Sequence, residues 1–456
     1  MTYTRIIKNW DHLATSELRS RALQIIEAGI IRVLPSTIMQ TAVGFERSSK
    51  TLSVNNDVFL VSGRLFIIGG GKASGLMAQT LENILGTDVI ESGLIAEKAN
   101  PREFRTRKIK IVQAGHPIPD NRGIKAVNEM LALKLKYTIT QNDLILCLIS
   151  GGGSALMPCP LESISLSDKQ HVSELLLSCG ANINEINVVR KHLSRTKGGR
   201  LAQYFAPARI ISLILSDVIG NDLSVIASGP TFPDSSTYQE AYTVLRKYHL
   251  SAKVPEGVIS ILESGCRGEI AETPKSLSNA INYIIGDNQI ALEAMEEKAR
   301  QLGFTPLILA SEQTGETANV ARQRAREIFS GNYKGYDALL IGGETTPELP
   351  DKPGRGGRNQ HYTAVTLEQF VNYPGDWLLA SIGTDGSDFV PEVAGAIVDR
   401  LTLRAIESKK IDIKTHLERY DSYTLLNNIG NSLVITGNTH TNVGDVILYL
   451  FRSNQA

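Results

Sequence analysis

Short apolar runs of strand length alternate with longer stretches of helical period along almost the whole chain. This alternation is typical of strands joined by crossover helices, so it predicts an α/β protein. Helical spacing is clearest in residues 72–85, where apolar side chains recur on one face. The chain has no repeat of fixed period and no low-complexity tract, which argues against solenoids and disordered arrays.

The expected strands form two series, and the sequence between them changes character. After an opening helix around residues 16–34, the first series lies at 65–68, 93–96, 109–113, 143–149 and 209–215. The second series lies at 281–285, 305–309, 338–342, 377–382, 433–436 and 446–451. We therefore expect two α/β domains with mostly parallel sheets. Their expected bounds are a Rossmann-like domain at 1–240, a proline-punctuated helical junction at 241–278, and a second domain at 279–456.

Charge and hydropathy exclude several classes of partner. Lys and Arg number 47 and Asp and Glu number 47, so the chain lacks the basic field that nonspecific nucleic-acid binding needs. No apolar run approaches the roughly 18 residues needed to span a bilayer, and the first residues contain no signal-peptide core. The four cysteines and eight histidines match no disulfide or zinc pattern. We expect a cytoplasmic monomer or homodimer with no nucleic-acid or membrane partner.

The first glycine cluster, Gly69-Gly70-Gly71-Lys72, lies between an expected strand and an expected helix. Glycines let backbone N–H groups approach an anion, the helix N-terminus favours negative charge, and Lys72 adds a mobile cation. A Walker A loop is excluded by Phe66 and Ala73. An imperfect dinucleotide fingerprint remains, with Ser74 at its third glycine position and Glu91 about 20 residues further on. It leaves a nicotinamide-dependent reductase open.

A second cluster, Ser150-Gly151-Gly152-Gly153-Ser154, follows the strongly apolar strand at 143–149 and predicts another anion-binding loop. Leu156 stands where the elbow of a serine hydrolase needs glycine, which argues against Ser154 as a nucleophile. A basic stretch follows, in which Arg190 lies one helical turn from Asn187 and can grip a carboxylate or phosphate. The other basic residues of this stretch are Lys191, His192, Arg195, Lys197 and Arg200.

Two carboxylates follow the strand at 209–215, and both are candidate Mg²⁺ ligands. Mg²⁺ prefers oxygen donors and usually keeps substrate phosphates in its coordination shell. Asp222 also fits the start of a helical turn, so Asp217 is the favoured ligand.

The second half of the chain carries a corresponding set of polar loops. Glu344 and Thr345 follow a glycine pair at the end of a strand, and Asp385 follows another strand end. Arg358 lies in a glycine-rich segment at 354–360, which suits a loop that closes over charge developing in a transition state. We expect His440 to be a surface loop residue. The inventory of anion loops, cations and strand-end carboxylates without a clear nucleophile favours phosphoryl transfer.

These segments together resemble the glycerate 2-kinase family that carries a C-terminal MOFRL domain. The matching segments are Gly69 to Ala73, Ala114 to Pro117, Ser150 to Ala155, Asn187 to Ser194, Leu215 to Asp222, Ala227 to Thr231, Gly342 to Thr346, Gly356 to Gln360 and Gly383 to Gly386. The resemblance implies ATP- and Mg²⁺-dependent phosphorylation of D-glycerate at its 2-hydroxyl, in a cleft between two α/β domains. It also implies that Lys72 and Arg358 are the principal catalytic cations.

The chain departs from the family pattern in its C-terminal part. His361 stands where the family usually has an acidic residue, residues 387–392 replace a small proline-containing segment, and His440 stands in place of glycine. Two other functions stay open from sequence: a hydroxypyruvate reductase using NADH or NADPH, and a non-catalytic protein that binds nucleotide or sugar acid.

Overall fold

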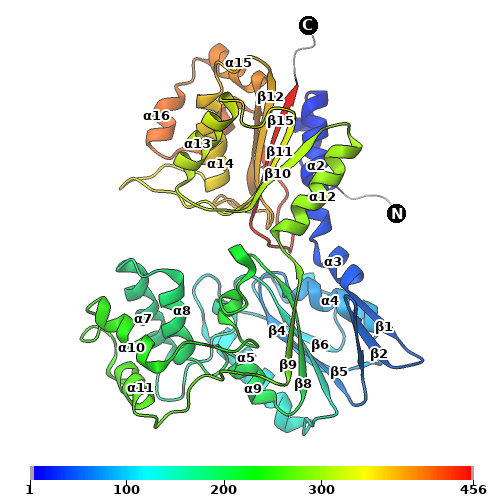
Figure 1. The fold of residues 1–456 in the computed structure, drawn as a ribbon, viewed down its shortest axis with the longest axis vertical. Helices are drawn as coiled ribbons and strands as arrows, with labels where there is room; N and C mark the ends of the chain where they lie inside the picture. Colours follow the sequence, from blue (N-terminus) through cyan, green and yellow to red (C-terminus); the bar gives the residue numbers. More distant parts are fainter. Residues whose placement is uncertain (1–4, 453–456) are drawn as a thin grey trace. The chain divides into compact units, whose positions relative to one another are not determined.

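The computed structural model describes residues 5–452, which form two compact units (Figure 1). The first unit is Ile38–Ile285, and the second unit comprises the residues up to Thr37 together with those from Gly286 onward. This division differs from the expected boundaries at two places. The opening helix α2 (Glu17–Arg32) belongs to the second unit, where it packs against α12 (Asn288–Gln301). The strand expected at 281–285 to begin the second domain belongs instead to the sheet of the first unit. Sequence periodicity shows that a helix has a buried face, but not which sheet covers it.

The first unit is built on a six-stranded sheet in the order β6-β5-β4-β7-β8-β9. The strands are β4 (Leu65–Gly70), β5 (Ile90–Glu97), β6 (Ile109–Gln113), β7 (Leu144–Ile149), β8 (Arg209–Leu215) and β9 (Ala280–Gly286). The pairings from β6 through β8 are all parallel. Numbered along the chain, this is the 3-2-1-4-5-6 order of a doubly wound fold, which confirms the Rossmann-like expectation. The strand order reverses between β4 and β7, where such sheets bind their ligands.

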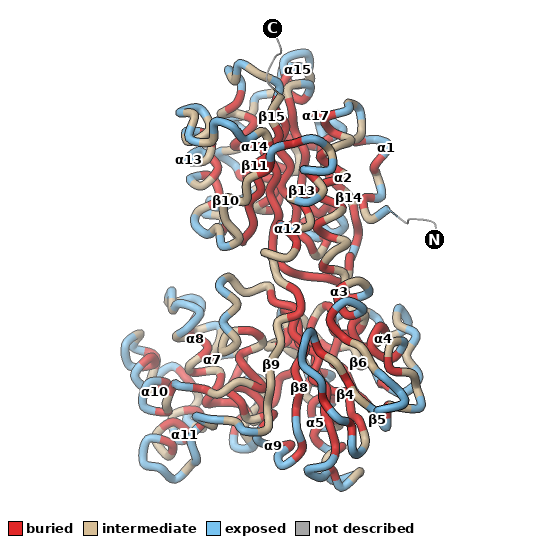
Figure 2. Tube along the Cα trace, turned by 45° about the vertical axis from the view of Figure 1, so that its right-hand side comes forward, coloured by how far each residue is buried: buried red, intermediate tan, exposed pale blue. Residues whose placement is uncertain are grey.

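Helices cover this sheet, and Figure 2 shows the strands β4 and β8 as buried, whereas the edge strand β9 is mostly intermediate. Helices α5 (Asn121–Lys136) and α9 (Arg200–Phe205) share one apolar core with alternate side chains of the strands, such as Phe66 and Ile68. Helix α4 (Ser74–Leu85) packs on the opposite face, toward which the intervening side chains point. A separate three-stranded antiparallel sheet, which the sequence did not predict, contains β1 (Val43–Glu46), β2 (Thr51–Val54) and β3 (Asp57–Leu60).

The expected helical junction is part of a four-helix cluster within the first unit. Its members α7 (Leu166–Ser178), α8 (Ile183–His192), α10 (Tyr238–Lys247) and α11 (Glu256–Cys266) share a core of their own. The polar, proline-rich sequence reflects short amphipathic helices with one buried face each. These residues therefore form a packed layer of the first unit.

The second unit has a six-stranded sheet in the order β10-β11-β15-β12-β13-β14. The strands are β10 (Pro306–Gln313), β11 (Ala338–Gly343), β12 (Asp376–Gly383), β13 (Val393–Asp399), β14 (Leu433–Ile435) and β15 (Asp445–Arg452). Only the β10–β11 pairing is parallel, so the expectation of a mostly parallel sheet is wrong for this unit. The short loop between β12 and β13 forces those strands to run antiparallel, because a parallel pair needs a long crossover.

Helices also cover both faces of the second sheet. One face packs against α13 (Thr317–Phe329), α14 (Arg358–Gln369), α15 (Arg400–Lys409) and α17 (Ser422–Ile429). Helices α2 and α12 also contact strands of this sheet, but their residues do not belong to this core. The remaining α-helices of the described residues are α1 (Trp10–Leu13), α3 (Pro35–Ala42), α6 (Gly153–Leu156) and α16 (Ile413–Glu418). Within residues 5–452, no single helix has the length and hydropathy to cross a bilayer, and only the consecutive pair α2 and α3 meets both requirements jointly.

Candidate functional site

The loops after β4 and β7 contact each other at the point where the strand order reverses. A Cβ on Gly69 would lie 2.0 Å from the Leu148 carbonyl oxygen, and one on Gly71 would lie 2.1 Å from Ser150 Oγ. Gly69 and Gly71 also have φ of +136° and +154°, which side chains rarely adopt. Glycine is therefore required here so that the two loops can pack closely.

The N–H groups of the first glycine loop are hydrogen-bonded within the protein. The Lys72 N–H donates to the Gly151 carbonyl at 2.9 Å, and the Ala73 N–H donates to Ser150 Oγ at 3.0 Å. Gly71 donates to a neighbouring strand, and Gly70 lies inside β4. The N–H groups of Lys72 and Ala73 thus join the two loops through Gly151 and Ser150. A role of Gly70, Gly71 and Ser150 in binding an anion stays a prediction.

A buried carboxylate occupies the N-terminus of α4. Glu97, at the end of β5, accepts hydrogen bonds from the N–H groups of Gly75 at 2.6 Å and Lys98 at 2.7 Å. Its burial raises the pKa of the Glu97 carboxyl to about 7 although these N–H groups favour the charged form. Glu91, the acidic residue of the imperfect fingerprint, is exposed at the other end of β5, beside the start of β4. It lies at the wrong edge of the sheet to bind a ribose next to the glycine loop.

Glu97 makes the stability of the fold depend on pH near neutrality. A carboxyl with its pKa raised from 4.5 to about 7 stabilises the folded state fully below pH 4.5, and this contribution is lost as the pH rises through 7. Glu97→Gln cannot ionise, so its free energy of unfolding should fall less steeply between pH 5.5 and 7.5 than that of the wild type. The expected difference in slope is up to about 1 kcal/mol per pH unit. Urea unfolding across this range measures it, and identical slopes would show that Glu97 keeps an ordinary pKa.

Gly152 brings Lys72 and His116 side by side. With φ of +80°, Gly152 is placed so that a Cβ would lie 2.8 Å from His116 Cδ2 and 3.2 Å from Lys72 Cγ. Among residues 5–452, no protein acceptor is seen for the N–H groups of Gly151 and Gly152. The second glycine loop therefore has two backbone N–H groups that can serve a ligand, and the Lys72 side chain lies beside it.

A chain of hydrogen bonds runs from this loop into the helical cluster. Lys197 donates to the Ser154 carbonyl at 2.9 Å and contacts Ser154 Oγ at 2.7 Å. Ser154 Oγ lies 3.0 Å from Ser228 Oγ, which donates to Asn187 Oδ1 at 3.0 Å. Ser228 and the adjacent Ala227 have positive φ values of 61° and 50°, a strained conformation that often marks functional loops.

Three cations of the first unit line one cavity of about 310 Å³: Lys169, Arg190 and Lys197. Burial, assisted by neighbouring positive charges, lowers the pKa of Lys169 to about 7 and lowers that of Lys197 well below its usual range.

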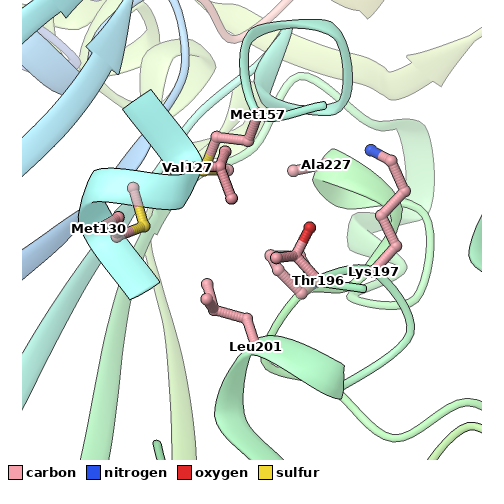
Figure 3. A pocket seen from close by; sticks show the side chains of 8 residues that line it. Val127, Met130, Met157, Thr196, Lys197, Leu201 and Ala227 are labelled. Atoms are coloured by element: carbon pink, nitrogen blue, oxygen red, sulfur yellow. The ribbon is translucent and has the colours of Figure 1, made fainter. Parts of the chain in front are cut away.

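A second, small apolar cavity lies beside the alkyl part of Lys197, as Figure 3 shows, and Met157 and Leu201 also line it. The lysine stem is thus held by apolar packing while its amino group reaches Ser154.

The expected metal ligands follow β8 as the sequence suggested. Asp217 is partly buried, whereas Asp222 is exposed and accepts a hydrogen bond from the Ser224 N–H at 2.8 Å. Asp222 therefore opens a tight turn, which agrees with the structural alternative considered for it. In the described part of the chain, no three His, Cys, Asp or Glu side chains are grouped to hold a metal ion.

In the second unit, two carboxylates fix the Arg358 guanidinium at the start of α14. Arg358 Nε lies 2.6 Å from Asp445 Oδ2, and Nη1 lies 2.8 Å from Glu344 Oε1. These carboxylates raise the pKa of Arg358 despite its burial. Asp445 belongs to β15 and Glu344 follows β11, so neighbouring strands hold the cation in one orientation.

Asp388 supplies a negative charge at the N-terminus of α14. Its buried carboxylate accepts hydrogen bonds from the N–H groups of Asn359 at 3.1 Å and Gln360 at 2.8 Å. A Cβ on Gly357 would lie 2.2 Å from Asp388 Cγ, so this glycine permits the contact. Burial raises the pKa of the Asp388 carboxyl to about 6. The unusual segment 387–392 thus provides the helix with an internal anion.

A cavity of about 270 Å³ lies beside Arg358. It is lined by the prolines and glycines of the 347–357 loop, by Leu349 and Phe389, and by Tyr420. His361, another departure from the family pattern, stacks on Tyr420 with ring centroids 4.0 Å apart. Burial lowers the pKa of His361 to about 4, so this imidazole is neutral at physiological pH and supports the cavity wall.

Thr345 and Asp385, the other expected site residues of the second unit, both make hydrogen bonds within the protein. Thr345 is buried and accepts a hydrogen bond from Thr317 Oγ1 at 3.1 Å. Asp385 accepts from the Ser387 N–H at 3.0 Å and helps to form the turn after β12. Neither contact tests a role in substrate binding.

Sequence reasoning missed several residues of these sites, among them Lys169, Ser228, Glu97 and Asp445. Lys169 lies in an amphipathic helix with only ordinary signals, and Asp445 starts an apolar strand. The available hint was the Ala227 to Thr231 segment, which belongs to the set of motifs that carry the family resemblance and contains Ser228.

Comparisons with known proteins agree with this architecture. A family model described as a domain of unknown function (DUF4147) matches residues 21–263, and the MOFRL family model matches residues 337–445. The glycerate 2-kinase of Pyrococcus horikoshii is 36% identical over 445 residues, which cover 96% of this chain and 98% of that protein. The chain belongs to the glycerate 2-kinase family.

Other members of the glycerate 2-kinase family support the assignment. The D-glycerate 2-kinase of Thermotoga maritima is 36% identical, covering 95% of this chain and 98% of that protein. A crystal structure of glycerate kinase from the same organism matches with a TM-score of 0.82 and 35% identity, covering 95% of this chain and 99% of that one. Two Agrobacterium vitis proteins that carry hydroxypyruvate reductase as a provisional name are 36% and 37% identical, over 84% and 87% of this chain and 98% and 89% of their own.

Proposed function

We propose that this protein transfers the γ-phosphoryl group of ATP to the 2-hydroxyl of D-glycerate, giving 2-phosphoglycerate and ADP. The observation that carries the proposal is the position of Lys72, beside the second glycine loop where the strand order of a doubly wound sheet reverses. Relatives named for this activity cover nearly the whole chain.

In the proposed mechanism, the chain acts mainly through positioning and electrostatics. Phosphoryl transfer passes through a loose transition state that needs alignment and neutralisation of charge more than covalent help. Lys72 contributes a mobile point charge from the first unit. Arg358 contributes a guanidinium from the second unit, and because Glu344 and Asp445 already hold it, little reorganisation is needed during the reaction.

The acidic residues after β8 fit a hard divalent cation. Asp217 and Asp222 offer carboxylate oxygens, the donor type that Mg²⁺ prefers, and Mg²⁺ commonly uses only one or two protein carboxylates beside substrate phosphates. We propose Asp217 as the main ligand, with Asp222 in support. When bound, Mg²⁺ supplies neutralisation of phosphate charge.

Phosphorus NMR of a reaction with ATP, MgCl₂ and D-glycerate tests the proposal directly. We expect the resonances of ADP and of a phosphate monoester on C2, whose phosphorus couples to a single carbon-bound proton. A product phosphorylated on C3, with two coupled protons, would contradict the choice of hydroxyl, and no D-glycerate-dependent ADP would contradict the kinase itself.

The reductase alternative is tested by a separate measurement. The exposed position of Glu91 at the far edge of the sheet removes its main support from sequence. We therefore expect no hydroxypyruvate-dependent loss of NADH or NADPH absorbance, and turnover at the rate of the kinase reaction would overturn this conclusion.

A further inference from the structure

Three basic side chains, Lys169, Arg190 and Lys197, line one cavity of the first unit, and no buried carboxylate lines it with them. In the described residues, none of the three forms an ion pair with a carboxylate within 4.0 Å. Glu174 also lines the cavity, but its side chain is exposed to solvent. The electrostatic field inside the cavity therefore favours an anion.

Lys169 is the most informative of the three. The residue is 7% exposed, and its Nζ is buried with no hydrogen-bond partner. Lys191 of the same unit is similarly buried but pairs with Asp234 at 3.2 Å. Burial without a partner disfavours the ammonium form of Lys169, and an anion bound beside its Nζ would restore the charge and accept its hydrogen bonds.

The three cations are not equivalent. Lys197 already donates to the carbonyl oxygen of Ser154 and contacts its hydroxyl. Arg190 has only a long contact, 3.5 Å from its Nε to Ser173 Oγ. The groups with spare donors are thus Lys169 Nζ and the Arg190 guanidinium, whose planar fork matches the two oxygens of a carboxylate.

We propose that Lys169 and Arg190 bind the carboxylate of the acceptor acid, with Lys197 holding Ser154 in place beside it. The assignment rests on the proposed kinase function and names the part of the acceptor that the first unit recognises. Ser154 and Ser173 line the same cavity and offer hydroxyls to the neutral part of a small hydroxy acid. Two open cations suit one carboxylate better than the higher negative charge of a triphosphate, which kinases usually neutralise with metal ions as well.

The kinetic test compares Lys169→Met and Arg190→Met with the wild type, varying D-glycerate and ATP separately. Losing one charge-assisted hydrogen bond to a carboxylate should raise the KM for D-glycerate about 10- to 100-fold and leave the KM for ATP within about twofold. The matched control is Lys125→Met, which removes an exposed lysine from α5 and should change neither constant. A rise in the KM for ATP with that for D-glycerate unchanged would assign the cavity to nucleotide phosphate and overturn the proposal.

Calorimetry separates this proposal from the kinase function. Titrating D-glycerate into the wild type without nucleotide should give binding that weakens at least tenfold in Lys169→Met, while glycerol, which lacks the carboxylate, should not bind. Binding lost in the variant but no ADP formed by the wild type would contradict the kinase and keep the carboxylate site. ADP formed with unchanged binding in both variants would keep the kinase and overturn the site.

Stability gives a readout that does not depend on activity. Without ligand, Lys169→Met removes an unpartnered buried amine and fills its place with an apolar side chain, so its melting temperature should equal or exceed that of the wild type. D-glycerate should raise the melting temperature of the wild type but not of this variant. A lower melting temperature in the variant would show that Lys169 supports the fold instead of a ligand.

Discussion

Lys72→Ala should lower kcat for ATP-dependent phosphorylation of D-glycerate by about 100-fold, equivalent to about 3 kcal/mol of transition-state stabilisation. The proposed contact of Lys72 forms mainly as charge develops on the migrating phosphoryl group, so the KM for each substrate should change much less than kcat. The fold should be little affected because Lys72 follows β4 in a loop fixed by backbone hydrogen bonds and by glycine packing. Steady-state kinetics with coupled detection of ADP measures the effect.

The matched control for this prediction is Lys98→Ala, which removes an exposed lysine after the neighbouring strand β5. Its kcat should stay within about twofold of the wild type if the effect at position 72 depends on location and not on net charge. Lys72→Arg distinguishes the effect of the positive charge from that of the donor geometry, because it keeps the charge but changes the shape of the donor. If Lys72→Ala retained wild-type kcat, Lys72 would have no catalytic role.

The glycine loops show what sequence reasoning can and cannot establish at this site. Their position after strands β4 and β7 was predictable, because glycine clusters directly follow apolar runs. The use of their N–H groups was not, because the acceptors Gly151 and Ser150 come from a loop almost 80 residues further along the chain. Hydrogen bonds between distant segments depend on the packing of the sheet, which local patterns do not specify.

The sequence also predicts the sheet of the first unit better than that of the second. In the first unit, strands alternate regularly with helices, and the sequence predicts the parallel sheet and its strands β4 to β8. It fails for β9, because the apolar run at 281–285 was expected to begin the second domain. In the second unit, β13 was missed and four of the five pairings are antiparallel. A fully buried apolar strand looks alike in parallel and antiparallel sheets, so its direction depends on connections that sequence shows poorly.

The buried charges were the hardest part to predict. Lys169, Glu97 and Asp388 each lie within segments that read as ordinary helix, strand or loop from sequence. Their importance comes from burial and from the partners that tertiary structure does or does not provide. The departure at 387–392 gains a physical explanation only when Asp388 is seen at the start of α14.

Arg358→Gln should reduce both catalysis and stability. Loss of a preorganised cation should lower kcat by about 100- to 1,000-fold. The change also leaves Asp445, whose side chain is 5% exposed, as a buried carboxylate without its main partner. Because Arg358 itself is 30% exposed and solvent screens part of the pair, we expect the free energy of unfolding to fall by about 2 kcal/mol. Urea unfolding and ADP formation measure the two effects on the same protein.

The double variant Arg358→Gln/Asp445→Asn separates these effects. Asparagine removes the uncompensated charge, so the free energy of unfolding should return to within about 1 kcal/mol of the wild type, while kcat should stay as low as in the single variant. Asp445→Asn alone keeps Arg358 paired with Glu344 and should lose less activity than either variant that lacks the arginine. Recovery of activity together with stability in the double variant would mean that Arg358 acts only by holding the second unit together, and its proposed catalytic role would be wrong.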